Sequence, residues 1–148
     1  MEDDRRAGHQ ALIAARGVHH LAIQVRDLAA AERFYCETLG LRVVRRWPAA
    51  DGAGERSIWV DTGDGAFLAL EVTTAAPHTP GGGPAAPPYP AGLHLFALRI
   101  EAGDRAAWQQ RFASAGVAVY HQTAFTIYVR DPEGNRIGLS HYPVPAGD

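Results

Sequence analysis

The sequence predicts an α+β fold made of two βαβββ modules. The main evidence is an order of strand-like and helix-like segments that occurs twice, with a Pro/Gly-rich stretch between the two copies. The 148 residues correspond to about one domain, and a composition of 47% hydrophobic and 20% charged residues is ordinary for a globular protein. A domain of this size can bury a core without disulfide bonds.

The first copy begins with residues 18–25, whose apolar and β-branched side chains predict a strand. Asp27 is a good N-cap for the helix that follows, and Gly40 supplies its C-terminal stop. Three further strands are predicted at residues 41–47, 57–61 and 67–73.

The second copy follows a stretch over residues 75–90 that cannot form a central strand or a helix, because it is rich in Pro and Gly. Asp104 and Gly116 bound the predicted second helix. The predicted strands are residues 93–100, 117–121, 125–129 and 136–142, with a tight turn at 131–135. We therefore divide the chain into an arm (1–16), one domain (17–143) made of modules 17–74 and 92–143 with linker 75–91, and a tail (144–148).

Alternation along the predicted strands separates two kinds of face. In the first module the apolar sets are Leu21, Ile23 and Val25, and Leu68, Leu70 and Val72. The mixed sets are His20, Ala22 and Gln24, and Phe67, Ala69 and Glu71. We expect the apolar sets to pack under the helices and the mixed sets to line a concave face. His94 shares a face with Phe96 and Leu98, and a pseudo-twofold axis between the modules would point His20 and His94 at one another, a nucleus for a metal site.

Charge, hydropathy and cysteine content limit the partners and the compartment. A formal charge of −2 gives no electrostatic reason to expect nucleic acid, and no apolar stretch is long enough to span a membrane. The single cysteine, Cys36, excludes an intrachain disulfide and fits a reducing, cytoplasmic compartment. A small molecule is the expected partner.

Two segments resemble a known superfamily. The run from His20 to Leu28, followed by Arg33-Phe-Tyr and Leu39-Gly-Leu, resembles the opening of a vicinal oxygen chelate module, and residues 127–139 resemble its closing hairpin. This superfamily contains glyoxalases, bleomycin resistance proteins and extradiol dioxygenases. The resemblance implies that the modules pair into a cup-shaped, half-barrel mixed sheet with helices outside, and that the protein is a homodimer.

The resemblance also implies a divalent metal ion (Fe, Mn, Ni or Zn) in the cup, with a His from the first strand of each module, here His20 and His94. The usual carboxylates of the final strands are replaced by Ala69 and Gly138. Glu71, two residues beyond Ala69, is the candidate third ligand or the catalytic base.

A substrate pocket would be lined by Gln24, Trp59, Phe67, Phe96, Tyr120, His121, Tyr128 and Arg136, although aromatic residues also favour strands without any ligand. The leading hypothesis is a glyoxalase- or dioxygenase-like enzyme whose metal binds vicinal oxygens of a metabolite and stabilises an enediolate or oxyanion. Lyase, isomerase and dioxygenase chemistry remain open. The alternative is a metal-free binding protein that sequesters a drug or secondary metabolite, which the vacant carboxylate positions favour and the two histidines oppose.

Overall fold

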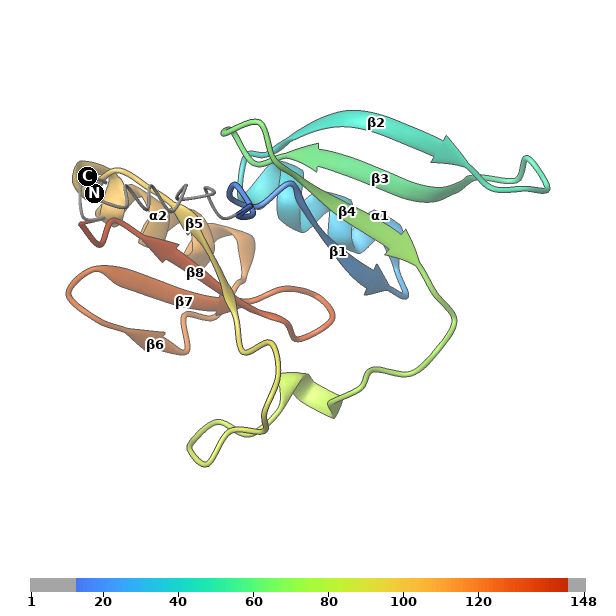
Figure 1. Cartoon of the computed structure of the whole chain (residues 1–148). Helices are drawn as coiled ribbons and strands as arrows, with labels where there is room; N and C mark the ends of the chain where they lie inside the picture. Colours follow the sequence, from blue (N-terminus) through green and yellow to red (C-terminus); the bar gives the residue numbers. More distant parts are fainter. Residues whose placement is uncertain (1–12, 144–148) are drawn as a thin grey trace, which may run out of the picture.

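Two four-stranded mixed sheets lie side by side, each with a helix on one face (Figure 1). The computed structural model describes residues 13–143, and it confirms the predicted α+β class and the two βαβββ modules. The sheets are open rather than closed into barrels, as a cup requires. The predicted tail (144–148) and residues 1–12 of the predicted arm fall outside the described residues.

The first sheet has the order β1 (His20–Val25), β4 (Phe67–Val72), β3 (Glu55–Asp61), β2 (Arg42–Pro48). β1 pairs parallel with β4, and the other pairs are antiparallel. The second sheet repeats this order with β5 (Phe96–Arg99), β8 (Arg136–Ser140), β7 (Thr126–Arg130) and β6 (His121–Gln122).

Capping residues begin and end the helices largely where the sequence predicts. The side chain of Asp27 accepts a hydrogen bond from Ala30 N (2.9 Å) at the start of α1 (Leu28–Glu32). This helix continues as a π-helical segment, η1 (Arg33–Thr38), and the chain then turns at Gly40, whose φ is 77°. In the second module a 3₁₀ turn, η3 (Ala102–Asp104), precedes α2 (Arg105–Ala115), so Asp104 makes no side-chain cap.

Two predicted strands are shorter than expected. The strand predicted at 93–100 begins only at Phe96, which pairs with Ile137. Its neighbour β8 begins at Arg136, opposite Leu95, so residues 93 and 94 have no part of β8 beside them. The strand predicted at 117–121 is reduced to β6, because Val117 N bonds back to Phe112 O at the helix end. Between β4 and β5 the linker carries one short 3₁₀ turn, η2 (Pro80–Gly82).

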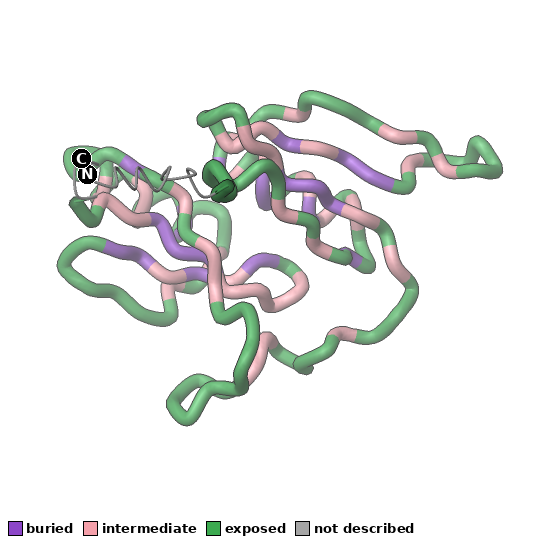
Figure 2. Tube along the Cα trace, viewed as in Figure 1, coloured by how far each residue is buried: buried purple, intermediate pink, exposed green. Residues whose placement is uncertain are grey.

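One hydrophobic core serves both modules. It joins Phe34 and Val60 of the first module to Phe112 and Ile127 of the second in a single buried cluster. Buried positions lie in the strands and helices, whereas the linker is mostly exposed (Figure 2). The helix-facing sides of both sheets are therefore buried in the core, and the opposite sides remain available for a site. No helix within residues 13–143 has the length and apolar character needed to cross a membrane.

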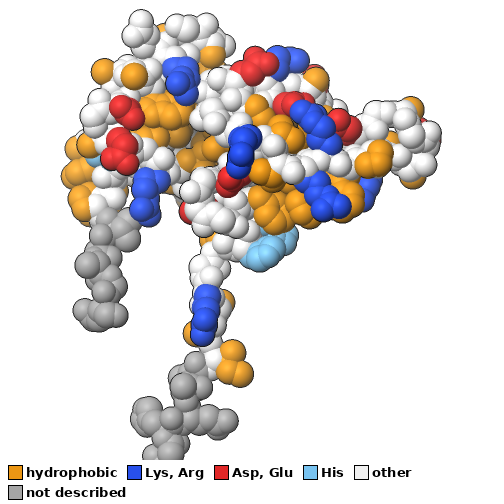
Figure 3. Space-filling view, turned by 90° about the horizontal axis from the view of Figure 1, so that it is seen from above, with side chains coloured by type: hydrophobic (Ala, Val, Ile, Leu, Met, Phe, Trp, Pro, Cys, Tyr) orange, Lys and Arg blue, Asp and Glu red, His pale blue; other side chains and the backbone are white. Residues whose placement is uncertain are grey.

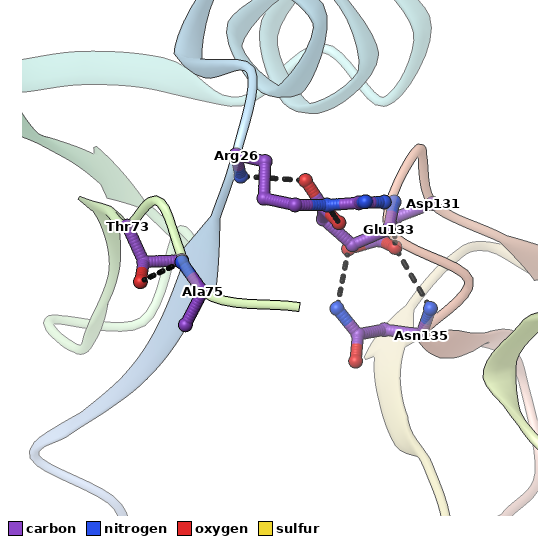
Figure 4. Close-up of polar contacts among 6 residues, drawn as sticks. All are labelled: Arg26, Thr73, Ala75, Asp131, Glu133 and Asn135. Atoms are coloured by element: carbon purple, nitrogen blue, oxygen red, sulfur yellow. Dashed lines mark hydrogen bonds and ion pairs between the residues drawn. The ribbon is translucent and has the colours of Figure 1, made fainter. Parts of the chain in front are cut away.

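A polar clasp between the modules involves the β7–β8 turn (Figure 4). Arg26, at the end of β1, donates from its backbone N (2.6 Å) and from Nε (3.0 Å) to the two carboxylate oxygens of Glu133. The buried Tyr35 hydroxyl donates to Asp131 Oδ2 (2.7 Å), which also accepts from Asn135 Nδ2 (2.9 Å). Asp131 Oδ1 accepts from the backbone N–H groups of Glu133 (3.0 Å) and Asn135 (2.8 Å). We call Arg26, Tyr35, Asp131 and Glu133 the inter-module clasp.

Candidate functional site

The face opposite the helices in the first sheet is the one that carries the mixed residue sets. The β1–β4 register pairs His20 with Phe67, Ala22 with Ala69 and Gln24 with Glu71. The alternating residues, among them Val25 and Leu70, are buried against the helix. The predicted division of faces in this module is confirmed except at Val72, which is exposed at the end of β4. We call the side that bears His20 the open face of the first sheet.

An aromatic strip crosses this open face, with one residue from each strand: His20 on β1, Phe67 on β4, Trp59 on β3 and Trp47 on β2. His20 stacks on Phe67 (ring centroids 4.9 Å apart, 7° between planes), and Phe67 stacks on Trp59 (4.3 Å, 20°). Trp47 meets Trp59 at 61° and 5.4 Å. Because the first three rings stack on one another, their rims rather than their faces are directed away from the sheet.

Arginine side chains cover the outer end of this strip. The guanidinium carbon of Arg45 lies 3.9 Å from the ring centroid of Trp47, and that of Arg56 lies 5.3 Å from it. Arg45 is exposed at the surface. Cation–π contacts of this kind hold the guanidinium groups near the ring, so this end of the strip is electropositive. In Figure 3, which views the molecule from above Figure 1, charges of both signs are interspersed with hydrophobic side chains.

The predicted metal ligands of the first module do not lie next to one another. Glu71 is paired with Gln24, whereas His20 is paired with Phe67 four residues earlier on β4. Four residues of strand correspond to about 13 Å. One imidazole nitrogen of His20 is already engaged, because His20 Nδ1 lies 2.8 Å from His19 Nδ1.

His94 does not lie on the open face of the second sheet. It precedes β5 and packs on Tyr89 (ring centroids 4.5 Å apart), and it lines a shallow pocket with Ile23 and Phe96. The register supplies the physical reason. Ala97 pairs with Gly138 in the second module as Ala22 pairs with Ala69 in the first, so the position equivalent to His20 is Leu95.

The vacant carboxylate positions are filled by close packing rather than held open. Ala69 is 2% exposed. A Cβ atom built on Gly138 would lie 3.2 Å from Ala97 Cβ and 3.2 Å from Thr126 Cγ2, which is tighter than ordinary contact. Across residues 13–143 no three His, Cys, Asp or Glu side chains are grouped so that they could hold a metal ion.

The open face of the second sheet is basic and tyrosine-lined, and the linker is bonded to one end of it. Tyr128 lies opposite Gly138, with Tyr120 and His121 beside it. Arg136 donates from Nη2 to Pro84 O (2.6 Å), and its guanidinium lies over Tyr89 at 5.2 Å. Burial raises the pKa of the Tyr120 phenol, although the nearby Arg130 and Arg136 act in the opposite direction.

The sequence analysis misplaced one pocket residue, Phe96, and missed two residues of the open face, Trp47 and Ser57. Phe96 does not lie on the open face: it packs against the core next to Ile137, because its register gives it the buried side of β5. Trp47 and Ser57 were missed, although their period-2 spacing from Arg45 and Trp59 was visible in the sequence. Which residues of β2 face the strip depends on two register irregularities with β3, which no local pattern reveals.

Comparison with known proteins gives one family and several similar structures. Residues 17–139 match the model of the Glyoxalase/Bleomycin resistance protein/Dioxygenase superfamily. No curated protein matches the chain.

Three solved structures illustrate the range of similar proteins. A glyoxalase/dioxygenase from Nostoc punctiforme is 23% identical (TM-score 0.71), covering 87% of this chain and 94% of that one. TnmS3, an antibiotic binding protein from a Streptomyces species, is 26% identical (TM-score 0.57; 87% and 98%). The fosfomycin resistance protein FosX from Listeria monocytogenes, complexed with Mn(II) and a dihydroxypropylphosphonic acid, is 12% identical (TM-score 0.69; 88% and 96%).

Proposed function

Because the chain belongs to the Glyoxalase/Bleomycin resistance protein/Dioxygenase superfamily, we propose that it is a binding protein for a planar aromatic small molecule. The aromatic strip is the observation that carries this proposal, since each of the four strands contributes one ring to a single open face. A flat ligand laid across the ring rims makes edge-to-face contacts, a preferred arrangement of aromatic pairs. The similarity to TnmS3, which is named as an antibiotic binding protein, points in the same direction.

The second candidate is a metal-dependent lyase, isomerase or dioxygenase, as the Mn(II) complex of FosX illustrates for the fold. Catalytic sites of this kind need about three protein ligands. The residues present do not fit that requirement, because Leu95 replaces the second histidine and Ala69 and Gly138 replace the carboxylates. The residue types at these positions are the same whether a cup forms within one chain or between two chains. Neither arrangement therefore supplies the missing metal ligands. This donor set is therefore too small for a metal centre, and Glu71 has no metal-bound substrate to deprotonate.

We propose further that the protein acts as a cytoplasmic homodimer. Cys36 is unpaired and half-buried, which is compatible with a reducing compartment. A homodimer is the assembly that the resemblance to the superfamily implies. Equilibrium sedimentation of the purified protein tests the oligomeric state.

Fluorescence titration tests the binding proposal, because two of the three tryptophans lie in the strip and the third, Trp108, lies on α2. Fluorene-2-carboxylate, a flat and soluble probe, is expected to quench the fluorescence saturably in the presence or absence of EDTA. Phe67→Ala should weaken binding about tenfold by removing the central ring. Trp108→Phe, the matched control, should leave the Kd unchanged.

Elemental analysis of protein purified without added metal separates the two candidates. Binding of the probe that appears only after Mn, Fe, Ni or Zn is added would contradict the proposed function, and so would a stoichiometric ion that is lost in His20→Ala. Failure of the probe to bind at the solubility limit would also contradict it. Circular dichroism of each variant checks that the fold is intact.

A further inference from the structure

Three of the buried polar atoms that have no hydrogen-bond partner lie together on the open face of the first sheet. They are Trp47 Nε1, Ser57 Oγ and Trp59 Nε1. Trp47 and Ser57 are directly paired across β2 and β3, and Trp59 is the next residue of β3 on the same face. The only other such atom found among residues 13–143 is Arg105 Nη1, which belongs to α2.

This grouping requires an explanation because buried polar groups in folded proteins are almost always hydrogen-bonded. An indole N–H can only donate, and a neighbouring aromatic face is a weak acceptor at best. The Ser57 side chain is as inaccessible as the core, since the residue is 1% exposed.

The surroundings of these atoms supply donors where an acceptor is needed. Arg45 and Arg56, which lie against the Trp47 ring, carry no acceptor atom. Glu71, which carries acceptor oxygens, is the register partner of Ser57 across β3 and β4, yet Ser57 Oγ has no hydrogen-bond partner. The two indole N–H groups therefore lack an oxygen acceptor, and the Ser57 hydroxyl beside them lacks any partner.

We infer that Trp47, Ser57 and Trp59 form a subsite for a carbonyl oxygen, which makes the ligand a planar aromatic ketone. This inference rests on the proposed function, because the ketone is carried by the flat ligand that the aromatic strip binds. One carbonyl oxygen has two lone pairs and can accept from the hydroxyl and an indole N–H together. Because these atoms are buried in the free protein, a ligand can reach them only when neighbouring side chains change rotamer, a change that is common on binding.

A pair of matched probes tests the subsite. Fluorenone-2-carboxylate and fluorene-2-carboxylate are both flat and carry the same charge, and they differ at one ring carbon, which is a carbonyl in the first and a methylene in the second. We expect the ketone to bind about tenfold more tightly to the wild-type protein, because its ring carbonyl, unlike a methylene, can accept hydrogen bonds from two of the buried donors. The measurement is the ratio of the two Kd values by isothermal titration calorimetry.

Two variants test whether the preference for the ketone depends on the buried hydroxyl and indole N–H groups. Ser57→Ala removes the hydroxyl, and Trp47→Phe keeps a ring while removing the N–H. In each variant the ratio of the two Kd values should fall towards one, whatever the change in overall affinity, because both probes experience the same change in ring contacts. Trp108→Phe, remote from the open face, should keep the full preference. Should either variant fail to fold, Trp59→Phe provides the same comparison.

The outcomes distinguish the inference from the proposed function. Equal affinity of the two probes for the wild-type protein, or a preference retained in all donor variants, overturns the subsite and leaves the binding proposal intact. Such a result would assign the donors to a trapped water or to a rotated Glu71. Binding of neither probe overturns both.

Discussion

The hydrogen bond between Tyr35 and Asp131 should contribute measurably to stability, because it joins the two modules inside the protein. The Tyr35 side chain is fully buried, and its hydroxyl donates to a carboxylate oxygen at 2.7 Å. A hydrogen bond to a charged group contributes about 1.5–3 kcal/mol. Tyr35→Phe leaves the carboxylate with three other donors, from Asn135 and Glu133. We therefore expect a loss from the lower part of that range, about 1.5–2 kcal/mol.

Urea unfolding followed by tryptophan fluorescence measures this loss, with the slope m unchanged if the variant alters stability alone. Tyr128→Phe is the matched control, because Tyr128 is only half-buried and lies on the open face of the second sheet. It should shift the free energy of unfolding by less than about 0.5 kcal/mol. Equal effects of the two substitutions would refute the assignment of the clasp as a stabilising contact.

The same bond predicts a loss of stability in alkali. Burial, together with the adjacent Asp131 carboxylate, raises the pKa of Tyr35 well above the ordinary tyrosine value. The contribution is therefore complete below about pH 10, the ordinary value, and is lost as the pH rises towards the folded-state pKa. Tyr35→Phe should remove this part of the alkaline loss. Parallel stability profiles of the two proteins above pH 10 would contradict the argument.

Three further predictions concern the clasp, the linker and the vacant carboxylate position. Although burial acts to raise it, the pKa of Glu133 is lowered by hydrogen bonds from Arg26; its contribution is present above about pH 4.3 and lost as the pH falls through the folded-state pKa. The stability difference between wild type and Glu133→Gln should thus shrink between pH 7 and pH 3 in urea titrations, and a constant difference would oppose this. Gly82→Ala should release the linker and speed thermolysin cleavage there, because a Cβ would overlap the β7–β8 turn, whereas Gly81→Ala, with similar φ and open space, should not. Gly138→Glu should lose about 1–3 kcal/mol through overpacking and gain no affinity for Mn(II) in calorimetry; a stable, metal-binding variant would contradict the fit argument.

The order of the elements could be predicted from the sequence because local chemistry specifies it. Asp27 caps its helix with the expected hydrogen bond, and Gly40 and Gly116 turn the chain with φ of 77° and 69°. Strand ends were less predictable, because they depend on the neighbouring strand rather than on local preference. β5, for example, begins only where β8 is available to pair with it.

The placement of His94 shows that a shift of one residue along a strand decides whether a side chain can contribute to a site. His20 and His94 both precede a leucine at the start of a strand-like run, which made them look equivalent. A shift of one residue moves a side chain to the other face of a sheet. The apolar set Phe96, Leu98 and Ile100 already indicated which side of the second run is buried, but the pairing of Ala97 with Gly138 is needed to show that Leu95 takes the position of His20.

The two open faces also differ in the chemical character of the other side chains that they carry. The first sheet presents four stacked or touching rings, and the second presents Tyr128 with Arg136 and the attached linker. A symmetric metal site needs equivalent donors from both modules. A flat, polar ligand, in contrast, can be bound by one aromatic surface and one basic surface. The duplicated fold thus supplies two faces that carry different side chains, which is why the fold alone does not decide between catalysis and binding.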